Sequence, residues 1–236
     1  MISSKENSPI FVTGVERSGS TLIAKILQLC GGYTGTTNVM CENTAIKALG
    51  ELYYKQIVPV DKNTVIGQYP LPDTKELIPL PTWHKQVLDC LSRYDGKQPW
   101  VYKSAKLVQL WPIWFSAFPN ARWIIVRRRT GDIVYSCTKT AHMIAFKNEV
   151  NQKLIGASNE KEAWLFWVRE HEKRFVEMIE AGVNCKVVWP ERMADGDYQQ
   201  IYEMLEWVGL TWSDKIITTI QPLLWKGRIL RKGGEK

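Results

Sequence analysis

The sequence predicts an α/β fold of three layers, in which a central parallel β-sheet is flanked by helices on both faces. Short β-branched runs alternate with longer helical segments along the chain, which is the pattern of strands joined by crossover helices. The 236 residues are 45% hydrophobic, enough for one sizeable core but short for two. Because there is no internal repeat or long linker, we assign residues 1–236 to a single domain, with a polar tail at 1–8 and a basic tail at 226–236.

The first half of the chain predicts two strands and two helices. Residues 9–15 form an apolar run typical of a buried strand, and a helix covering 21–27 should end at Gly31 and Gly32. A Pro-rich stretch at 67–81 predicts irregular structure. A short strand follows at 100–103, and a helix is expected over 107–118.

The second half continues the alternation of strands and helices. Strands are expected at 122–127 and 185–189, a helix begins near Asp132, and the segments 199–208 and 214–224 look helical. The clearest helical period lies in 160–181, where apolar residues recur at spacings of three and four. The expected buried stripe comprises Trp164, Trp167, Val168, His171, Phe175, Met178 and Ile179. On this stripe His171 is predicted to be a packed histidine.

Composition limits the cellular setting and the partners. The polar start of the chain predicts no secretory signal, and no apolar run approaches the roughly 20 residues of a membrane span. An odd number of scattered cysteines indicates reduced thiols in a cytoplasmic protein. These are Cys30, Cys41, Cys90, Cys137 and Cys185. The net charge of +7 favours an anionic partner, either nucleic acid, an acidic membrane face or a phosphorylated small molecule. No oligomeric state is indicated.

Residues 14–21, with the sequence GVERSGST, are the first candidate binding motif. They follow a strand and open a helix, so backbone N–H groups and the helix N-terminus can cradle an anion. Gly14 and Gly19 permit a tight turn, while Ser18, Ser20 and Thr21 add hydroxyl donors. The alternative is an ordinary Ser/Thr-capped turn. The well-marked strand and helix favour a P-loop-like phosphate-binding loop after the first strand.

This loop differs from the Walker A motif of nucleotide triphosphatases, because Ser20 occupies the lysine position. The basic residue instead lies earlier, at Arg17. Here the sequence resembles the sulfotransferase family, whose 5'-phosphosulfate loop reads Lys or Arg, Ser, Gly, Thr, Thr. The resemblance implies a donor nucleotide, PAPS (3'-phosphoadenosine-5'-phosphosulfate), bound by Arg17, Ser18, Gly19, Ser20 and Thr21, with PAP as the product.

A second motif resembles the family's 3'-phosphate site. That site reads strand, then Arg-Asn-Pro-x-Asp, with Ser eight residues after the Arg. Aligning Asp132 with the motif's Asp implies that Arg128 and Ser136 hold the 3'-phosphate. The chain departs from the family at Arg129 and Thr130, where Asn and Pro are usual. A solvated arginine run or nucleic-acid contacts are the alternatives.

Three more stretches extend the resemblance along the chain. Residues 103–112 are similar to a segment that begins Lys-Thr-His in cytosolic members, and residues 187–193 and 207–210 are similar to two later family segments. Near the end, Arg231, Lys232 and Gly233 resemble an Arg-Lys-Gly that also holds the 3'-phosphate. A simple basic tail is the alternative for these last residues. The resemblance covers about Pro9 to Gly234.

The family's chemistry implies roles for two cations. Sulfonate transfer resembles phosphoryl transfer in passing through a loose in-line transition state with negative charge growing on the leaving oxygen. Fixed positive charges aimed at that oxygen should supply most of the catalysis. Arg17 and Lys103 are the residues we expect there. The reaction requires no metal, and the sequence contains no metal-ligand cluster.

The general base departs from the commonest family pattern. Ala105 stands where many cytosolic members have the His of Lys-Thr-His. The tyrosylprotein and heparan types instead use a Glu shortly after the phosphate-loop helix, and Glu42 falls in that region. The hypothesis is that Glu42 is the base. Its alternative is an acidic residue capping the following helix. His84 and His142 are weaker candidates.

Two competing functions remain open at this stage. A P-loop small-molecule kinase would need the missing lysine and an acidic Mg²⁺ ligand, whereas a non-catalytic nucleotide- or polyanion-binding protein would fit Ala105. If the chain is a sulfotransferase, the expected acceptor is a small molecule, sugar or peptide with a hydroxyl or amine, and no nucleic-acid partner is expected. Residues 50–100, with Tyr53, Tyr54, Tyr69 and Trp83, are predicted to form the acceptor wall.

Overall fold

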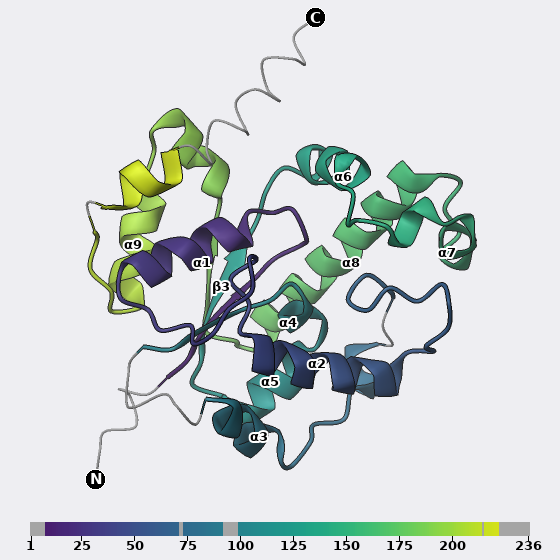
Figure 1. Ribbon diagram of the computed structural model, residues 1–236, viewed down its shortest axis with the longest axis horizontal. Helices are drawn as coiled ribbons and strands as arrows, with labels where there is room; N and C mark the ends of the chain where they lie inside the picture. The colour runs from purple at the N-terminus through teal and green to yellow at the C-terminus, as the bar shows by residue number, and fades with distance from the viewer. Residues whose placement is uncertain (1–7, 71–72, 92–98, 214, 222–236) are drawn as a thin grey trace, which may run out of the picture.

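A parallel sheet of four strands forms the centre of the molecule. The computed structural model describes residues 8–70, 73–91, 99–213 and 215–221. Its strands are β1 (Ile10–Thr13), β2 (Val101–Lys103), β3 (Arg122–Val126) and β4 (Cys185–Val188), arranged in the order β2-β1-β3-β4 with every pairing parallel. The predicted α/β fold with a central parallel sheet is confirmed (Figure 1).

Helices cover both faces of this sheet, because alternate strand residues point to opposite sides. In β1, Ile10 and Val12 belong to one core, whereas Phe11 belongs to the other. The first face is covered by α1 (Ser20–Leu29) and α9 (Gln199–Trp207), which lie together on one side in Figure 1. The second face carries α2 (Thr44–Ile57), α3 (Trp83–Cys90), α4 (Lys106–Gln109), α5 (Trp111–Ala117), α6 (Thr130–Lys139) and α8 (Glu160–Glu180). This is the predicted three-layer arrangement.

Shorter elements complete the chain. The six-residue helix α7 (Glu149–Leu154) precedes α8, and residues 215–221 are helical after α9. Short 3-10 helices occur as η1 (Thr74–Glu76) within the irregular 67–81 stretch, η2 (Ala145–Lys147) and η3 (Pro190–Asp195). For the described residues of the 67–81 stretch, the predicted irregular character is confirmed apart from η1.

The strand order places the end of β1 at a switch point. The chain leaves β1 for β2 on one side and returns from β2 to β3 on the other side of β1. In open parallel sheets, ligands bind in the crevice outside the carboxyl ends of the strands at such a point. The loop that follows Thr13 therefore begins where this architecture offers a binding site.

Aromatic packing fixes β1 in the larger core. The Phe11 ring meets Trp123 edge-on with 4.8 Å between ring centroids, and Trp114 of α5 with 5.3 Å. Trp100 and Phe118 make further edge-on contacts at 5.7 Å. Edge-on geometry is favourable because the ring edge is positive and the ring face negative. These contacts tie the sheet to the helix layer beneath the site.

Two expectations about elements on the second face are corrected. The expected helix over 107–118 is two helices, interrupted at Leu110, because Pro112 lies at the start of α5 and has no N–H to continue the ladder. On α8, Ile179 is 53% exposed, and the buried stripe includes Arg174, whose Nη1 donates to the Gln109 carbonyl at 2.9 Å. His171 is buried, as predicted.

The prediction that aromatic residues in 50–100 form the acceptor wall is also partly wrong. Tyr53 and Trp83 are core residues, packed edge-on against each other and, for Trp83, against Trp114. Tyr54 is fully buried and donates its hydroxyl hydrogen to the Tyr69 carbonyl. Which aromatic side chains face the sheet depends on tertiary packing, and residue type alone does not specify it.

All five cysteines are free, in agreement with the sequence. Among the residues that the structure describes, no helix is both long and apolar enough to cross a membrane.

Replacing Phe11 by Ala is expected to destabilise the fold by about 3–5 kcal/mol, because it removes a fully buried ring from four aromatic neighbours. Urea unfolding followed by tryptophan fluorescence measures this change. Val39→Ala, at a side chain that is 94% exposed, is the control and should lie within about 0.5 kcal/mol of wild type. An equally small effect of Phe11→Ala would contradict the packing described here.

Candidate functional site

The predicted phosphate loop occupies the switch point, between the end of β1 and the start of α1. A Cβ atom on Gly14 would lie 2.4 Å from the Val126 carbonyl oxygen and 2.5 Å from Ser18 Oγ, so only glycine allows this close approach to β3. Gly19 has a φ of +101°, in the left-handed region that favours glycine. The two glycines thus have the roles that the motif implied.

The start of α1 is suited to an anion. Gly19 is the N-cap and supplies no side-chain cap, and the first turn contains no acidic residue. Such a helix start leaves N–H groups and a partial positive charge available to a ligand. Ser18 is almost fully buried, and its hydroxyl has no hydrogen-bond partner. A buried hydroxyl without a partner is unfavourable, and a bound phosphate oxygen would satisfy it.

Backbone strain is concentrated at this site. Within the described residues, two non-glycine residues have positive φ, Arg17 at 70° and Cys41 at 57°. Arg17 lies inside the loop, and Cys41 immediately precedes Glu42. Left-handed non-glycine residues are uncommon and persist where surrounding contacts hold them, often at functional sites.

The two predicted anchors meet at Arg17. Its Nε donates to Ser136 Oγ at 2.9 Å, and Arg128 Nη1 donates to the Arg17 carbonyl at 3.2 Å. Ser136 lies on α6, and Arg128 lies between β3 and α6. The structure therefore brings the loop arginine together with both residues that the second motif implied.

The other two arginines of the run point elsewhere. Arg127 Nε donates to Glu172 of α8 at 3.1 Å, and its guanidinium lies 4.9 Å from the centroid of the Trp189 ring. The half-exposed Arg129 pairs with Asp132 at 3.4 Å and with Glu191 at 3.7 Å. Both are surface or packing residues, consistent with Arg128 as the member of the run that reaches the loop.

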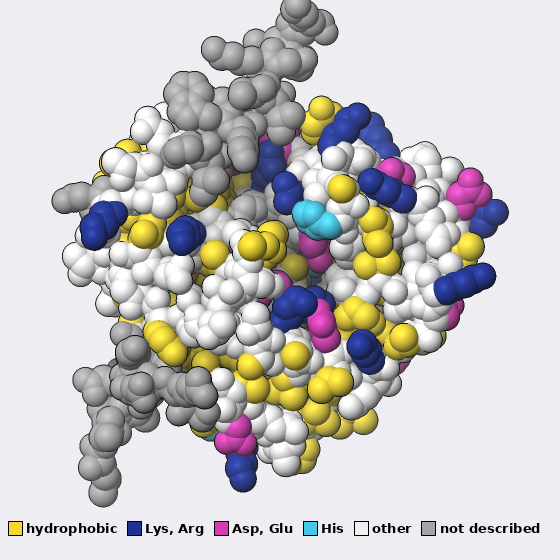
Figure 2. Space-filling model, viewed as in Figure 1, with side chains coloured by type: hydrophobic (Ala, Val, Ile, Leu, Met, Phe, Trp, Pro, Cys, Tyr) yellow, Lys and Arg dark blue, Asp and Glu magenta, His cyan; other side chains and the backbone are white. Residues whose placement is uncertain are grey.

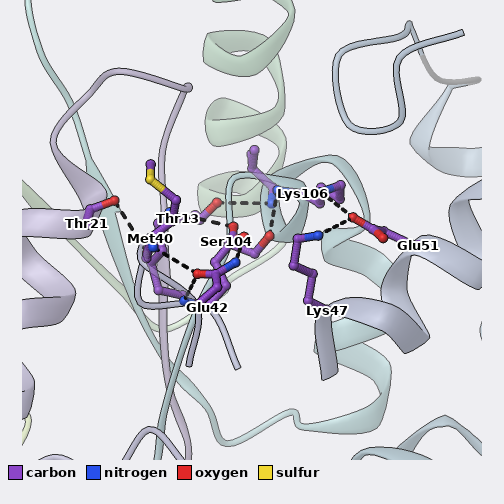
Figure 3. Close-up of polar contacts among 11 residues, drawn as sticks. Thr13, Thr21, Met40, Glu42, Lys47, Glu51, Ser104 and Lys106 are labelled. Carbon is purple, nitrogen blue, oxygen red and sulfur yellow. Dashed lines mark hydrogen bonds and ion pairs between the residues drawn. The ribbon is translucent and has the colours of Figure 1, made fainter. Parts of the chain in front are cut away.

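Lys103 and Glu42 form a buried pair beside the loop. Lys103 Nζ lies 3.6 Å from Glu42 Oε1, and both residues are more than nine-tenths buried. Burial lowers the pKa of Lys103, and the Glu42 carboxylate opposes that shift. The other Glu42 oxygen accepts from Asn38 Nδ2 at 3.2 Å. In Figure 3, Glu42 lies below Met40 and near Ser104, and Thr21 of the helix start lies to the left of all three.

The capping alternative for Glu42 is wrong. The N-cap of α2 is Asn43, whose side chain accepts from the Ile46 N–H at 3.1 Å. The backbone N–H of Glu42 donates to the Asn38 side chain at 3.0 Å, which holds the preceding turn. The carboxylate is therefore directed to Lys103 and not to the helix start.

A second charged cluster, which sequence reasoning missed, lies next to this pair. Glu51 Oε1 accepts from Lys47 Nζ at 2.7 Å and from Lys106 Nζ at 3.4 Å (Figure 3). These lysines lower the pKa of Glu51 against the effect of burial. Figure 2 shows a hollow near the middle of the face of the molecule that is turned to the viewer. Charged side chains of both signs and a histidine border it. In the sequence, Lys106, three residues after Lys103, is the residue from which this cluster could have been predicted.

Behind the loop, Glu16 contacts α8, a second feature that the sequence did not indicate. Its Oε2 accepts from Trp167 Nε1 at 2.8 Å and lies 3.8 Å from His171 Nε2. Burial lowers the pKa of His171, with Glu16 acting in the opposite direction. Sequence analysis missed this contact because Glu16 and Trp167 are far apart in the chain. The tryptophans on the α8 stripe were expected to be core residues.

The remaining candidates take no part in the phosphate-loop contacts described above or lie outside the described residues. His84 packs edge-on against Phe118, and His142 is exposed. Ala105 begins α4 and offers no acid–base group. Arg231, Lys232 and Gly233 lie outside the described residues. In the described part of the chain, no group of three or more His, Cys, Asp or Glu is placed to hold a metal ion.

Comparison with known proteins assigns the fold and the family. A model of the sulfotransferase family matches residues 9–214. The solved sulfotransferase STF9 from Mycobacterium avium superposes with a TM-score of 0.52 at 12% identity, covering 93% of this chain and 68% of that one. Sulfotransferase STF1 from Mycobacterium tuberculosis gives 0.47 at 16% identity, covering 92% and 71%. No curated protein sequence matches the chain.

Gly14→Ala is expected to impair the loop, because its new methyl group would overlap the Val126 carbonyl and the Ser18 hydroxyl. We expect a loss of about 1–3 kcal/mol of stability and a loss of anion binding. Thermal unfolding with and without PAP measures both effects. Gly50→Ala in α2, where a Cβ meets open space, is the control and should be neutral or slightly stabilising. A PAP response in Gly14→Ala equal to that of wild type would rule out this loop as the binding site.

Proposed function

This chain belongs to the sulfotransferase family, and we propose that it transfers a sulfonate group from PAPS to a hydroxyl or amine of its acceptor and releases PAP. The observation that carries the proposal is the junction at Arg17, where the phosphate loop, Arg128 and Ser136 meet. Positive charge, a free helix start and an unpartnered buried hydroxyl converge there. These groups match the requirements of a nucleotide with phosphates at both the 5' and 3' positions.

The loop supports the 5' end of this donor. Ser18, Gly19, Ser20 and Thr21 offer backbone N–H groups and hydroxyls to the phosphosulfate, and Arg17 faces the same anion. Arg128 and Ser136 hold the 3'-phosphate in this proposal. Arg231, Lys232 and Gly233 are proposed to add to the 3'-phosphate contacts.

The catalytic chemistry falls to Arg17, Lys103 and Glu42. Glu42 takes the proton from the attacking acceptor group, while the new bond forms to sulfur and the bond from sulfur to the phosphate oxygen breaks. Arg17 and Lys103 stabilise the negative charge that develops on that leaving oxygen. The 3.6 Å contact between Lys103 and Glu42 supports this assignment, because it places the proposed base beside a cation proposed to act on the leaving oxygen.

The acceptor is proposed to enter the hollow bordered by α2 and α4. Glu42 precedes α2, and Lys47 and Glu51 lie on it, so this hollow is lined by charges of both signs. A small molecule, a sugar or a peptide with a hydroxyl or amine suits such a lining. The five free cysteines support a reducing compartment, and we place the protein in the cytoplasm.

The kinase alternative is disfavoured by the family and by the loop. Ser20 stands at the Walker lysine position, so the charge that reaches the outer phosphates of ATP is missing there. The non-catalytic alternative depends on Ala105, and the buried pair of Lys103 and Glu42 weighs against it by supplying a different base.

The donor site is tested by thermal unfolding with PAP, ATP, ADP and 5'-AMP. PAP at a hundredfold excess over its Kd should stabilise the protein by roughly 2.7 kcal/mol, and the other nucleotides should do less. Arg128→Ala should abolish the PAP effect. Arg129→Ala is a control of equal charge change at the half-exposed neighbour and should retain the effect. Stronger stabilisation by ATP, especially with Mg²⁺, would contradict the proposal.

The base is tested by Glu42→Gln. Release of PAP from PAPS is followed with a panel of phenols, alcohols, amino sugars and tyrosine peptides. We expect turnover to fall about 100-fold or more while PAP still stabilises the variant, since only proton transfer is lost. Glu203→Gln, at a half-exposed carboxylate on α9 that pairs with Lys186, is the control and should keep most of the turnover. Unchanged turnover in Glu42→Gln would remove Glu42 from the mechanism.

A further inference from the structure

Glu16 is an unexpected residue at a site for anions. It immediately precedes Arg17 in the phosphate loop, and its side chain is mostly buried. A carboxylate at this position could pair with the Arg17 guanidinium or repel the phosphosulfate. In the structure the carboxylate is directed to α8, whereas Arg17 Nε contacts Ser136.

The contact that directs it there is a single short hydrogen bond. Trp167 Nε1 donates to Glu16 Oε2 at 2.8 Å. Indole N–H is only a donor, and a hydrogen bond to a carboxylate is stronger than one between neutral groups. Trp167 is itself 2% exposed and packs edge-on against Phe146 and His171. Its N–H therefore has a fixed position on a helix of 21 residues.

The neighbouring histidine does not replace this donor. His171 Nδ1 lies 2.9 Å from the Trp167 carbonyl, an acceptor, so Nδ1 carries the hydrogen. In the neutral ring, Nε2 is then an acceptor and takes a hydrogen bond from Gln109 Nε2 at 3.4 Å. His171 Nε2, 3.8 Å from Glu16 Oε2, therefore has no hydrogen to donate to this carboxylate. Among the contacts described for Glu16, the indole N–H is the one that binds its carboxylate closely.

The two helices behind the loop act on successive residues. Ser136 of α6 contacts the Arg17 guanidinium, and Trp167 of α8 contacts the Glu16 carboxylate. Because α6 and α8 pack against each other, the two contacts share one rigid support. Opposite charges of adjacent loop residues are thereby separated, each on its own partner.

We propose that Trp167 is a positioning residue for donor binding: it holds the Glu16 carboxylate away from the anion site and so leaves Arg17 available to the nucleotide. This inference rests on the proposed function, because the anion concerned is the donor. Without the indole N–H, the buried carboxylate would compete with the nucleotide for Arg17.

The test is a double-mutant cycle on PAP affinity, measured by isothermal titration calorimetry. Trp167→Phe keeps an aromatic ring and removes the N–H together with the pyrrole part of the indole, and we expect it to weaken PAP binding about tenfold or more. Glu16→Gln alone should bind PAP within about threefold of wild type, and Glu16→Gln with Trp167→Phe should bind as Glu16→Gln does. This rescue by removal of a charge distinguishes positioning from lost packing.

Two further variants complete the experiment. Trp164 lies one turn before Trp167 on α8, and its indole N–H donates to Glu160 at 3.2 Å. Trp164→Phe removes this N–H as a control and should leave PAP affinity within about twofold of wild type. Glu16→Asp keeps the charge and the tryptophan but shortens the side chain, so it should weaken PAP binding as Trp167→Phe does. It also replaces Trp167→Phe if that variant does not fold.

The outcomes separate the two proposals. A wild-type protein that does not bind PAP would refute the donor site itself. Wild-type binding of PAP with no loss in Trp167→Phe would overturn the positioning role alone. Equal losses from Trp167→Phe in the presence and absence of Glu16 would also overturn it, because the tryptophan would then act independently of the carboxylate.

Discussion

The close approach of Gly14 to the end of β3 is the constraint on which the site depends. Because no Cβ fits between this glycine and the Val126 carbonyl, the loop after β1 lies directly against the start of the segment that carries Arg128. That proximity lets Arg128 reach the Arg17 carbonyl and lets Arg17 reach Ser136. The sheet order creates the crevice, and this contact determines which side chains meet in it.

Charge in the site is arranged in separate pairs. Glu42 faces Lys103, Glu51 faces Lys47 and Lys106, and Glu16 is withdrawn onto a helix. These three carboxylates therefore have partners other than the guanidinium groups of Arg17 and Arg128. Arg17 contacts the Ser136 hydroxyl, and Arg128 contacts the Arg17 carbonyl and lies 3.9 Å from the Asp132 carboxylate.

Local signals predicted most of the fold and the loop. Strand runs such as Ile10–Thr13 and the glycines of the loop depend on neighbouring residues, so the sequence was sufficient for them. It was insufficient where distant packing decides, as for Trp83, which lies in the core. The separation of α4 and α5 at Leu110, by contrast, had a local signal in Pro112. The contact between Glu16 and Trp167 joins residues 151 positions apart, and nothing local to either residue indicates it.

Arg128 donates a hydrogen bond to the loop backbone and, in the proposed function, also binds the 3'-phosphate, and these two roles together constrain how such a protein can evolve. A substitution at Arg128 changes the support of Arg17 together with the charge at its own position. The two subsites are therefore not free to diverge one at a time, and the effects of substitutions in them should be epistatic. A lineage that exchanged one nucleotide for another would have to rebuild both ends of the site in concert.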